Sequence, residues 1–376
     1  MSPASRPLGL GLCGVGRTGY GRIRRELSKV PPNADGSPRF VLTAAYDLLS
    51  ERARRLAEET GARAHGRFED LLADPAVDVV VIATRSDAHA PLAEAALRAG
   101  KHVVVEKPMA VNLAEADRLI RAATELGSDP ASGRVNGPQL LVRLSKRFDP
   151  TFRKAEQTLA AGELGKVHGV QLRVGEFVVR RDWQTLRRCG GGQLLNWGPH
   201  VIDWAVQLLG GTADVLWCEL RRVAAAGDAE DHVKLLLRGP TDILADVEIS
   251  GGNAAPQPMM VLQGDRGALT VYPDLAVLKQ LKQPLDRRRL SADEGPPPLD
   301  DRSYRAVSAD QWRVTETRFD PFDGEGRFWS AVFDRLTAGT PFPITLAQAR
   351  EVMRVIDEAR RLGQPDFEKR EVAAAD

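Results

Sequence analysis

A glycine-rich segment near the N-terminus is the first place where residue types and spacing indicate chemistry. Residues 14–19 read Gly-Val-Gly-Arg-Thr-Gly, a G-x-G-x-x-G pattern that follows a short apolar run and opens a helical one. In that context Gly14 permits a tight turn, Gly16 lets the backbone approach a diphosphate, and Gly19 lets the helix pack on the strand. The N-terminus of the helix then faces the negative charge. The pattern predicts a dinucleotide-binding turn, with a plain strand-to-helix turn as the alternative.

An acidic residue after the next strand-like run bears on which dinucleotide is bound. Residues 40–46 are of β type and end at Asp47. A carboxylate there accepts hydrogen bonds from the adenosine ribose hydroxyls of NAD and repels the 2′-phosphate of NADP. Asp47 lies further from the glycines than the roughly 20 residues that are usual, because the turn-rich segment 31–38 intervenes. Arg52 and Arg54 lie one or two turns into the next helix. We therefore predict NAD rather than NADP, while a helix N-cap remains the other role for Asp47.

The elements that must position these residues alternate between strand and helix as far as about residue 146. Apolar runs predict strands buried on both faces, and amphipathic or Ala-rich stretches predict helices between them. The predicted strands cover 8–13, 40–46, 77–83, 102–105 and 139–144, and the predicted helices cover 18–30, 49–60, 89–99 and 113–126. Such alternation predicts an α/β domain with a doubly wound parallel sheet.

The second part of the chain has a different pattern. Its β-type segments follow one another without long helices between them, which predicts an antiparallel sheet. These segments cover 168–179, 214–223, 232–238, 241–249 and 259–272, and the predicted helices cover 148–161, 194–209, 328–337 and 346–362. Residues 281–303 are rich in proline and charge and predict a mobile excursion, and the chain is expected to fray from about residue 368.

The overall composition excludes several classes of function. The 52 Lys and Arg residues balance 51 Asp and Glu residues to a net charge of +1, so the basic excess of a nucleic-acid binder is absent. Aromatic residues make up only 6%, which disfavours a stacking platform for single strands. A length of 376 residues favours two domains. We therefore expect a globular protein that acts on something small or binds another protein.

The cysteines and the apolar runs bear on the compartment. Cys13, Cys189 and Cys218 have no paired spacing, which argues against a disulfide framework and against a zinc site. We therefore expect no metal. No apolar run reaches the roughly 18 residues of a membrane-spanning helix, and the N-terminus does not resemble a signal peptide. These features predict a cytoplasmic protein with no membrane partner.

Two longer motifs carry a resemblance to a known family. Residues 83–89 read Ala-Thr-Arg-Ser-Asp-Ala-His, and residues 99–108 read Ala-Gly-Lys-His-Val-Val-Val-Glu-Lys-Pro. They are similar to the A-T-x-x-x-x-H and A-G-K-H-V-x-x-E-K-P motifs of the glucose–fructose oxidoreductase, inositol dehydrogenase and rhizopine-catabolism (Gfo/Idh/MocA) family. The likeness continues through 147–150, 162–167, 190–203 and 343–345, and it covers the chain from about residue 8 to 364.

The resemblance implies an oxidoreductase that uses a nicotinamide cofactor on a secondary alcohol of a sugar, polyol or glycoside. It implies a Rossmann domain over 1–146, a substrate-binding and oligomerisation domain with an open, mostly antiparallel sheet over 147–367, and a flexible tail over 368–376. It also implies a homodimer or homotetramer formed through that second sheet. The residues then expected to contact the cofactor are Gly14, Val15, Gly16, Arg17, Thr18, Gly19, Asp47, Thr84, Arg85, Ser86, His89, Glu106, Lys107 and Pro108.

Oxidation of an alcohol needs a group that takes the hydroxyl proton and a group that stabilises the developing alkoxide. By motif match Lys107 lies beside the nicotinamide, where its ammonium can stabilise the oxygen and relay a proton if its pKa is depressed. His200 is the candidate general acid or base, since imidazole titrates near neutral pH. Asp203 comes three residues later and could orient either the imidazole or the helix.

The sequence departs from the family pattern at two positions. Asn196 stands four residues before His200, where the family usually has Asp, and an amide binds a hydroxyl but cannot take a proton. We hypothesise that His200 and Lys107 carry the proton transfer while Asn196 positions the substrate. The alternative is that dehydrogenase activity is lost or redirected. Arg85 stands where Pro is common and could reach cofactor or substrate, or point to solvent.

A charged segment before that helix adds candidates for substrate binding. Trp183 can stack on a sugar face, and Arg180 and Asp182 can bond hydroxyls, with interface packing or a solvated cluster as the alternative. The full set expected at the substrate is Lys107, Arg180, Asp182, Trp183, Asn196 and His200.

Three functions are consistent with these residues. The first is an NAD(P)-dependent dehydrogenase of a carbohydrate-like substrate. The second is redox-neutral cleavage of a glycoside, in which transient oxidation acidifies a neighbouring C–H bond, the aglycone is eliminated and the product is reduced again. The third is an NAD-binding sensor or regulator without catalysis. Net NADH, product without net NADH, or binding alone would distinguish them.

Overall fold

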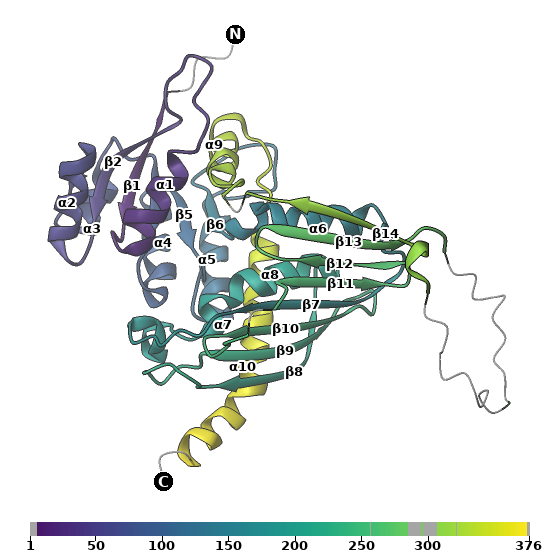
Figure 1. Cartoon of the computed structure of the whole chain (residues 1–376). Coiled ribbons are helices and arrows are strands. Elements are labelled where there is room, and N and C mark those ends of the chain that lie inside the picture. The colour runs from purple at the N-terminus through teal and green to yellow at the C-terminus, as the bar shows by residue number, and fades with distance from the viewer. Residues whose placement is uncertain (1–5, 256, 285–294, 296–306, 321, 374–376) are drawn as a thin grey trace.

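The computed structural model describes residues 6–255, 257–284, 295, 307–320 and 322–373. These residues fold around two β-sheets, a parallel one from the first part of the chain and a mostly antiparallel one from the second (Figure 1). The α/β class and the two kinds of sheet that the sequence predicts are therefore confirmed.

The first sheet has the strand order β3-β2-β1-β4-β5-β6, and its strands pair in parallel. The strands are β1 (Leu8–Cys13), β2 (Phe40–Tyr46), β3 (Arg63–Ala64), β4 (Val79–Ile82), β5 (His102–Glu106) and β6 (Leu140–Arg143). This is the order of a Rossmann sheet, which reverses between β1 and β4. Ligands of such sheets bind at that reversal, outside the carboxyl ends of the strands. The residues that follow β1, β4 and β5 are therefore placed at one edge.

Helices alternate with these strands, as the sequence predicts. They are η1 (Arg17–Ile23), a π-helical turn that continues into α1 (Arg24–Leu27), then α2 (Ser50–Thr60), α3 (Phe68–Ala73), α4 (His89–Arg98) and α5 (Leu113–Glu125). Every residue of β4 is buried, as a strand covered on both faces requires. Two elements were not predicted. β3 has only two residues, both exposed, and α3 is too short to show a helical period.

The second sheet has the order β14-β13-β12-β11-β7-β10-β9-β8. Its strands are β7 (Val167–Gly175), β8 (Asp214–Arg221), β9 (His232–Arg238), β10 (Leu244–Ser250), β11 (Met260–Gly264), β12 (Gly267–Val271), β13 (Leu275–Leu281) and β14 (Trp312–Arg318). Neighbouring strands are antiparallel except β7 and β10, which pair in parallel. Burial alternates along β9 and β10, so one face of the sheet is covered and the other is open.

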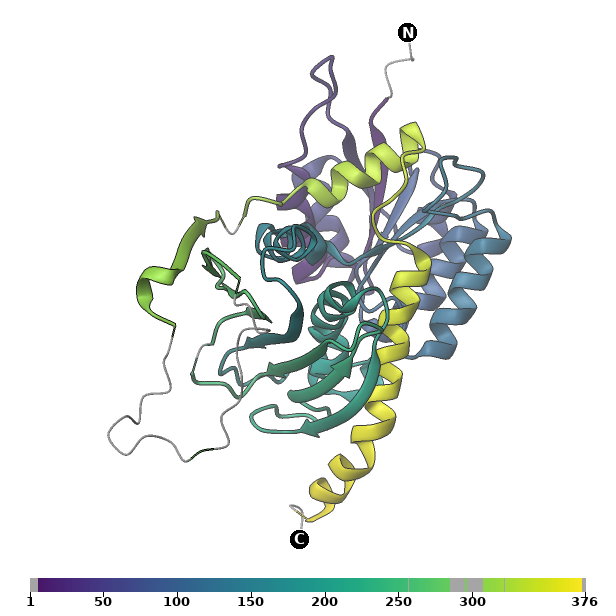
Figure 2. The same ribbon diagram turned by 90° about the vertical axis from the view of Figure 1, so that its right-hand side faces the viewer.

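The second part of the chain also forms helices, some of which pack on that sheet. They are η3 (Ser145–Phe148), α6 (Pro150–Ala160), η4 (Trp183–Thr185), η5 (Arg187–Cys189), α7 (Gln193–Asn196), α8 (Gly198–Leu209), η7 (Ala309–Gln311), α9 (Arg327–Ala338) and α10 (Leu346–Ala373). α8 packs on β7 and β10, and α10 crosses behind β8 (Figures 1 and 2). The open face carries charged pairs, such as Lys234 with Glu248 at 2.9 Å.

Several boundaries in this part differ from the prediction. The run 259–272 is a hairpin rather than one strand, because β11 and β12 turn at Asp265 and Arg266. β13 and β14 were not predicted, and most of the predicted excursion 281–303 lies outside the described residues. α10 continues to Ala373, so the segment from 368 that was expected to fray is helical through 373.

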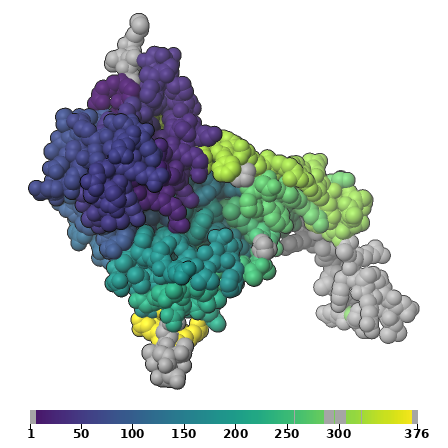
Figure 3. All heavy atoms as spheres, turned by 60° about the vertical axis from the view of Figure 1, so that its left-hand side comes forward, coloured from purple at the N-terminus to yellow at the C-terminus, as the bar shows by residue number. Residues whose placement is uncertain are grey.

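The last two helices return to the first sheet. Trp329 of α9 is fully buried, and its ring meets that of Phe40 at 5.8 Å, edge to face. α10 packs on α5, where Arg350 donates to Asp117 at 2.6 Å. The two halves therefore pack directly on each other, and Figure 3 shows the purple and blue N-terminal residues seated against the teal middle of the chain. This arrangement fixes the position of the first sheet's carboxyl edge relative to α7 and α8.

Candidate active site

A cavity of about 550 Å³ lies at the carboxyl edge of the first sheet. Its walls come from η1 and α1, from the ends of β4 and β5, and from the segment that contains α7 and α8. Most of the side chains singled out in the sequence line it, namely Arg17, Thr18, Thr84, Ser86, His89, Glu106, Lys107, Pro108, Arg180, Trp183, Asn196 and His200. The structure thus brings together residues that are up to 183 positions apart.

The glycine-rich turn has the geometry that a bound dinucleotide needs. Gly14 has a φ of +95°, and a Cβ added there would lie 2.5 Å from the carbonyl oxygen of Ala83. A Cβ on Gly19 would lie 2.1 Å from the carbonyl oxygen of Gly14. A Cβ on Gly16, by contrast, would meet no atom within 4 Å. Gly14 and Gly19 are therefore required by the fold itself, whereas Gly16 leaves room for a ligand to approach the backbone.

This contrast gives a prediction for Gly16. We expect Gly16→Val to fold normally and to lose at least about 100-fold in NAD affinity, because the new side chain fills the path of the diphosphate. Isothermal titration with NAD measures the affinity, and circular dichroism checks the fold. The matched control is Gly66→Val, since Gly66 also has open space around it but lies away from the cavity. Equal NAD affinities for the two variants would contradict this placement of the diphosphate.

Asp47 faces the glycine-rich turn rather than capping a helix. Its Oδ2 accepts a hydrogen bond from the backbone N–H of Val15 at 2.7 Å, and its Oδ1 accepts one from Leu49 at 2.9 Å. The N-cap of α2 is Leu49, with no side-chain cap, so the alternative role as N-cap is wrong. The Asp47 carboxylate therefore lies beside the glycine-rich turn.

Two other predicted cofactor residues have different surroundings. Arg85 is exposed, pairs with Asp87 at 2.9 Å and does not line the cavity, so of its open roles the structure supports pointing to solvent. His89 is buried, and its ring nitrogens lie 2.7 Å from the carbonyl oxygen of Pro108 and 3.2 Å from that of Thr84. Burial lowers the pKa of His89. Its imidazole braces the two loops that follow β4 and β5.

Lys107 lies directly after β5 and reaches across the cavity. Its Nζ donates a hydrogen bond to the backbone carbonyl oxygen of Asn196 at 2.8 Å, which joins the two halves. Burial lowers the Lys107 pKa to about 8, opposed by the charge of Glu106 and aided by those of Arg22, Arg143 and Arg180. The ammonium and the free amine are therefore both accessible near neutral pH, as a group that stabilises an alkoxide or moves a proton requires.

The neighbouring Glu106 is held by a buried arginine that sequence reasoning missed. Arg143 of β6 is fully buried, and its guanidinium donates to the carboxylates of Glu106 and Glu26. The second oxygen of Glu106 accepts the backbone N–H of Lys107 at 3.2 Å. Glu106 thus fixes the strand end from which Lys107 projects. The signal in the sequence is an arginine that ends the apolar run 140–142.

His200 is almost completely buried in the wall of the cavity, 3% exposed. Its Nδ1 has no hydrogen-bond partner among the described residues. Burial holds the His200 pKa well below its usual range, and the positive charges of Lys107, Lys146 and Arg143 add to this effect. The imidazole is therefore neutral at pH 7 and able to accept a proton. Lys146, which also lines the cavity, was not singled out in the sequence.

Asp203 does not orient the imidazole. Its carboxylate is buried and accepts two hydrogen bonds from the guanidinium of Arg147, one of them from Nε at 2.7 Å. Arg147 also donates to Gln348 at 2.8 Å. Of the two roles left open, the structure supports holding the helix: Asp203 fixes α8 to η3 and α10.

This buried ion pair gives a prediction for stability. We expect Asp203→Asn to lower the free energy of unfolding by about 3–5 kcal/mol, because it leaves the Arg147 guanidinium buried without its carboxylate. Urea denaturation measures the change. The control is Asp323→Asn, which breaks an exposed pair with Arg327 and should cost about 1 kcal/mol or less. A small effect for Asp203→Asn would show that water or another residue satisfies Arg147.

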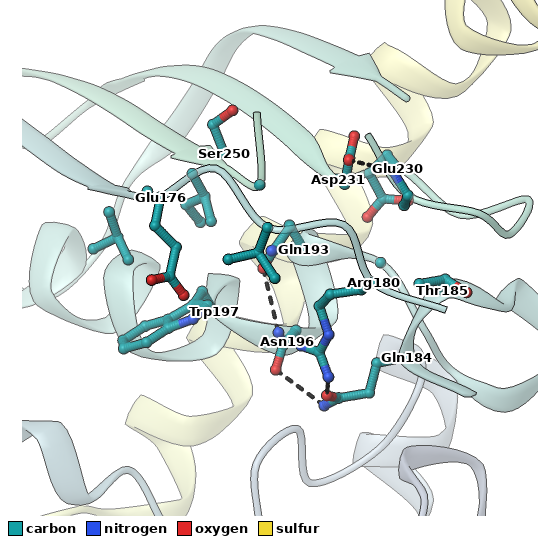
Figure 4. Close-up of a pocket in the computed structure, with 17 residues that line it drawn as sticks. Glu176, Arg180, Gln184, Thr185, Gln193, Asn196, Trp197, Glu230, Asp231 and Ser250 are labelled. Carbon is teal, nitrogen blue, oxygen red and sulfur yellow. Dashed lines mark hydrogen bonds between the residues drawn. The ribbon is translucent and has the colours of Figure 1, made fainter. Parts of the chain in front are cut away.

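Asn196 is the last residue of α7, and α8 begins two residues later with Pro199 in its first turn. The helix is therefore interrupted between Asn196 and His200, yet both line the same cavity. The Oδ1 of the Asn196 carboxamide accepts a hydrogen bond from Nε2 of Gln184 at 3.1 Å (Figure 4). Gln184 in turn accepts from Arg17 at 3.3 Å and from Arg180. Sequence reasoning missed Gln184, which belongs to none of the motifs.

The segment before α7 is ordered by Asp182. Its carboxylate accepts the backbone N–H of Gln184 at 3.0 Å and pairs with Arg180 at 2.7 Å. Arg180 and Trp183 line the cavity, but Asp182 does not, and its side chain is 47% exposed. The predicted role of Asp182 at the substrate is therefore not supported by its position, which serves to orient Arg180 and Gln184.

Among the described residues no group of three or more His, Cys, Asp or Glu side chains could hold a metal ion. In the same part of the chain no helix is both long and apolar enough to cross a membrane.

Comparisons with known proteins agree with the fold and the motifs. Residues 8–129 match a family model described as an oxidoreductase family with an NAD-binding Rossmann fold, and residues 152–270 match the GFO/IDH/MocA C-terminal domain. An uncharacterised oxidoreductase, YdgJ of Escherichia coli, is 30% identical over 91% of this chain and 94% of its own. Myo-inositol 2-dehydrogenase of Thermotoga maritima is 28% identical over 60% of this chain and 64% of its own. The WlbA dehydrogenase of Bordetella pertussis, solved with NADH and UDP-GlcNAcA, superposes with a TM-score of 0.73, 19% identity and 97% coverage of both chains.

Proposed function

Because this chain belongs to the Gfo/Idh/MocA family of NAD-binding oxidoreductases, we propose that it oxidises a secondary alcohol of a sugar, polyol or glycoside. The observation that carries the proposal is the single cavity in which Lys107 and His200 face the residues of the glycine-rich helix. Within the proposal, residues 1–146 hold the cofactor and residues 147–367 supply the substrate side. The myo-inositol dehydrogenase among the relatives supports a polyhydroxylated substrate.

The open space at Gly16 and the nearby carboxylate of Asp47 fit a bound dinucleotide. Bound there, NAD would accept the hydride from the carbon that is oxidised. The helix that begins at Arg17 has no acidic residue in its first turn, so its N–H groups would face a diphosphate without competing charge. Arg17 and Thr18 line the cavity next to that turn. Thr84 and Pro108 close the side of the cavity that follows β4 and β5.

The chain's own residues divide the chemistry between them. The imidazole of His200, which its lowered pKa keeps neutral at pH 7, takes the hydroxyl proton of the substrate. The Lys107 ammonium, held by the carbonyl of Asn196, stabilises the oxygen from which the proton leaves. The Asn196 carboxamide, fixed by Gln184, hydrogen-bonds a substrate hydroxyl and sets its orientation. Arg180 and Trp183 bound the space on the substrate side.

A panel of sugars and polyols tests this proposal. Incubation with NAD should give net NADH, read at 340 nm, for at least one member of the panel. Release of an aglycone without net NADH would favour the redox-neutral cleavage of a glycoside. Binding of NAD with neither outcome would favour a sensor.

NADP should support a lower rate than NAD, because the Asp47 carboxylate repels a 2′-phosphate.

The assembly and location are part of the same proposal. We propose a homodimer or homotetramer through the open face of the second sheet, where Trp217 of β8 is 46% exposed. Sedimentation velocity tests it, and a single monomeric species would contradict it.

We also propose a cytoplasmic location, which Cys13, Cys189 and Cys218 support because all three are free and buried.

A further inference from the structure

A second, smaller cavity of about 260 Å³ adjoins the first. It lies where β7 and β10 end, under the segment that precedes α7 (Figure 4). The two cavities share the wall residues Glu176, Arg180, Gln184, Asn196 and Trp197. Since Asn196 and Trp197 lie directly before the helix of His200, a ligand held at the reacting centre can extend past them into the smaller cavity.

Carboxyl groups stand out among the polar groups of the smaller cavity, which also include hydroxyls, amides and one guanidinium. Glu176 and Glu230 both line it, and among the described residues neither forms an ion pair. Glu230 accepts the backbone N–H of Leu194 at 3.1 Å, and burial raises the pKa of its carboxyl group. The one cationic side chain of the wall, Arg180, is already paired with Asp182. A ligand that donates hydrogen bonds is favoured here, and an anionic one is repelled.

The acceptors lie on different sides of the cavity. In Figure 4 Glu176 stands above Trp197 on one side, Glu230 lies with Asp231 on the other, and Gln193 lies between them. Asp231 is not available to a ligand in the same way, because its carboxylate already accepts three backbone N–H groups at 2.6–2.7 Å. Glu176 and Glu230 therefore remain to accept hydrogen bonds from hydroxyl or amine groups around the edge of a ring, whereas the Oε1 of Gln193 already accepts from Nδ2 of Asn196 at 3.4 Å.

The rest of the wall is apolar. Val174, Val178 and Ile249 line it from the strand ends, and the Trp197 indole forms part of the boundary with the larger cavity. A sugar ring combines an apolar face of C–H groups with an edge of hydrogen-bond donors, which matches a wall of this kind. Aromatic side chains commonly supply such a contact face while keeping a polar edge.

We propose that the smaller cavity is a second subsite, which takes an uncharged or amine-bearing sugar unit joined to the unit that Lys107 and His200 act on. The substrate is then a disaccharide or other glycoside rather than a free monosaccharide or a sugar linked to a nucleoside diphosphate. This inference rests on the proposed function for the position of the reacting centre. It adds to that function a second sugar unit of the substrate, which lies beyond Asn196 in the smaller cavity.

The first experiment compares ligands on the NAD-loaded protein. The probes are methyl pyranosides, neutral disaccharides, disaccharides with one amino sugar, and nucleoside-diphosphate sugars. We expect kcat/KM for the best disaccharide to exceed that for the matching methyl pyranoside by about tenfold. The amino-sugar arm distinguishes amine from hydroxyl donors as the favoured group. A nucleoside-diphosphate sugar that is turned over best would overturn the proposal.

The second experiment blocks the smaller cavity. Ala225 lines it, whereas the exposed neighbour Ala226 lines neither cavity. We expect Ala225→Phe to lower the disaccharide-to-pyranoside ratio of kcat/KM by about tenfold, and the control Ala226→Phe to keep it. If Ala225→Phe does not fold, Val178→Phe replaces it, with the exposed Val179→Phe as control. Equal ratios in the blocked and control variants would overturn the proposal.

Direct binding separates this inference from the proposed reaction. Isothermal titration of disaccharides into the NAD-loaded protein requires no turnover. If no probe is oxidised but a disaccharide binds and Ala225→Phe weakens it, the reaction is wrong and the subsite stands. If methyl pyranosides are oxidised and disaccharides neither bind nor react better, the reaction stands and the subsite is wrong. Absence of binding by every disaccharide also overturns the subsite.

Discussion

Replacing Lys107 by methionine is expected to lower kcat by about a thousandfold. Methionine keeps the length and apolar stem of the side chain but removes the ammonium that stabilises the substrate oxygen. It also removes the hydrogen bond to the carbonyl of Asn196 that spans the cavity. Steady-state kinetics with the best substrate of the panel measures the loss, and titration with NAD shows whether the cofactor still binds. The exposed Lys29→Met serves as the control.

The pH profile shows which form of Lys107 acts. With a pKa of about 8, the ammonium predominates below that pH and is lost above it. If the ammonium is the active form, kcat/KM should fall as the pH rises through about 8. In Lys107→Arg the guanidinium stays charged, so this decline should disappear from the accessible range even though the rate is lower. The same alkaline decline in both proteins would assign it to another group.

Replacing His200 by alanine is expected to lower kcat by about a hundredfold or more, whereas Asn196→Ala should cost about tenfold or less. The difference follows from chemistry, since an imidazole can take a proton and a carboxamide cannot. For Asn196→Ala most of the loss should fall on KM, because its carboxamide holds the substrate. The kinetic parameters of both variants, measured separately, test this division of roles.

Two controls make the comparison sharp. Added imidazole should restore part of the activity of His200→Ala, because the buried space that the ring leaves can accept it. Gln184→Ala should resemble Asn196→Ala, since Gln184 fixes the Asn196 carboxamide. Small and equal effects for His200→Ala and Asn196→Ala would remove the assignment of His200 as the base and favour a lost or redirected activity.

The sequence predicts the parts of the fold that depend on local pattern. β1, β2 and β9 begin and end where their apolar or alternating runs do, because the burial of a strand determines which of its consecutive residues are apolar. The hairpin of β11 and β12 was read as one strand, although Gly264, Asp265 and Gly267 are turn-forming residues that mark the turn. β14 is exposed along most of its length, so its sequence lacks the apolar alternation that would predict a strand.

The candidate site likewise has residues that the sequence predicts and contacts that it does not. Lys107 and His200 belong to contiguous motifs, so their presence could be predicted, and the structure places them around one cavity with Arg17 and Thr18 of the glycine-rich segment. Asp203, by contrast, faces Arg147, which is 56 residues away in the chain. Gln184 owes its position to Asn196 and Arg17. Such pairings depend on how separate elements pack, and nothing in the spacing of the residues specifies them.

The return of the last helices to the first sheet has a consequence for how the protein is made. Phe40 of β2 packs against Trp329 and Phe333, whose ring centroids lie 5.8 and 5.7 Å from its own. The Rossmann sheet leaves the ribosome long before α9 is synthesised, so this flank stays exposed to water until translation is nearly complete. The N-terminal half therefore completes its packing only when α9 has been synthesised. Ribosome-bound chains that stop before residue 327 should remain more open to proteolysis near Phe40 than the finished protein.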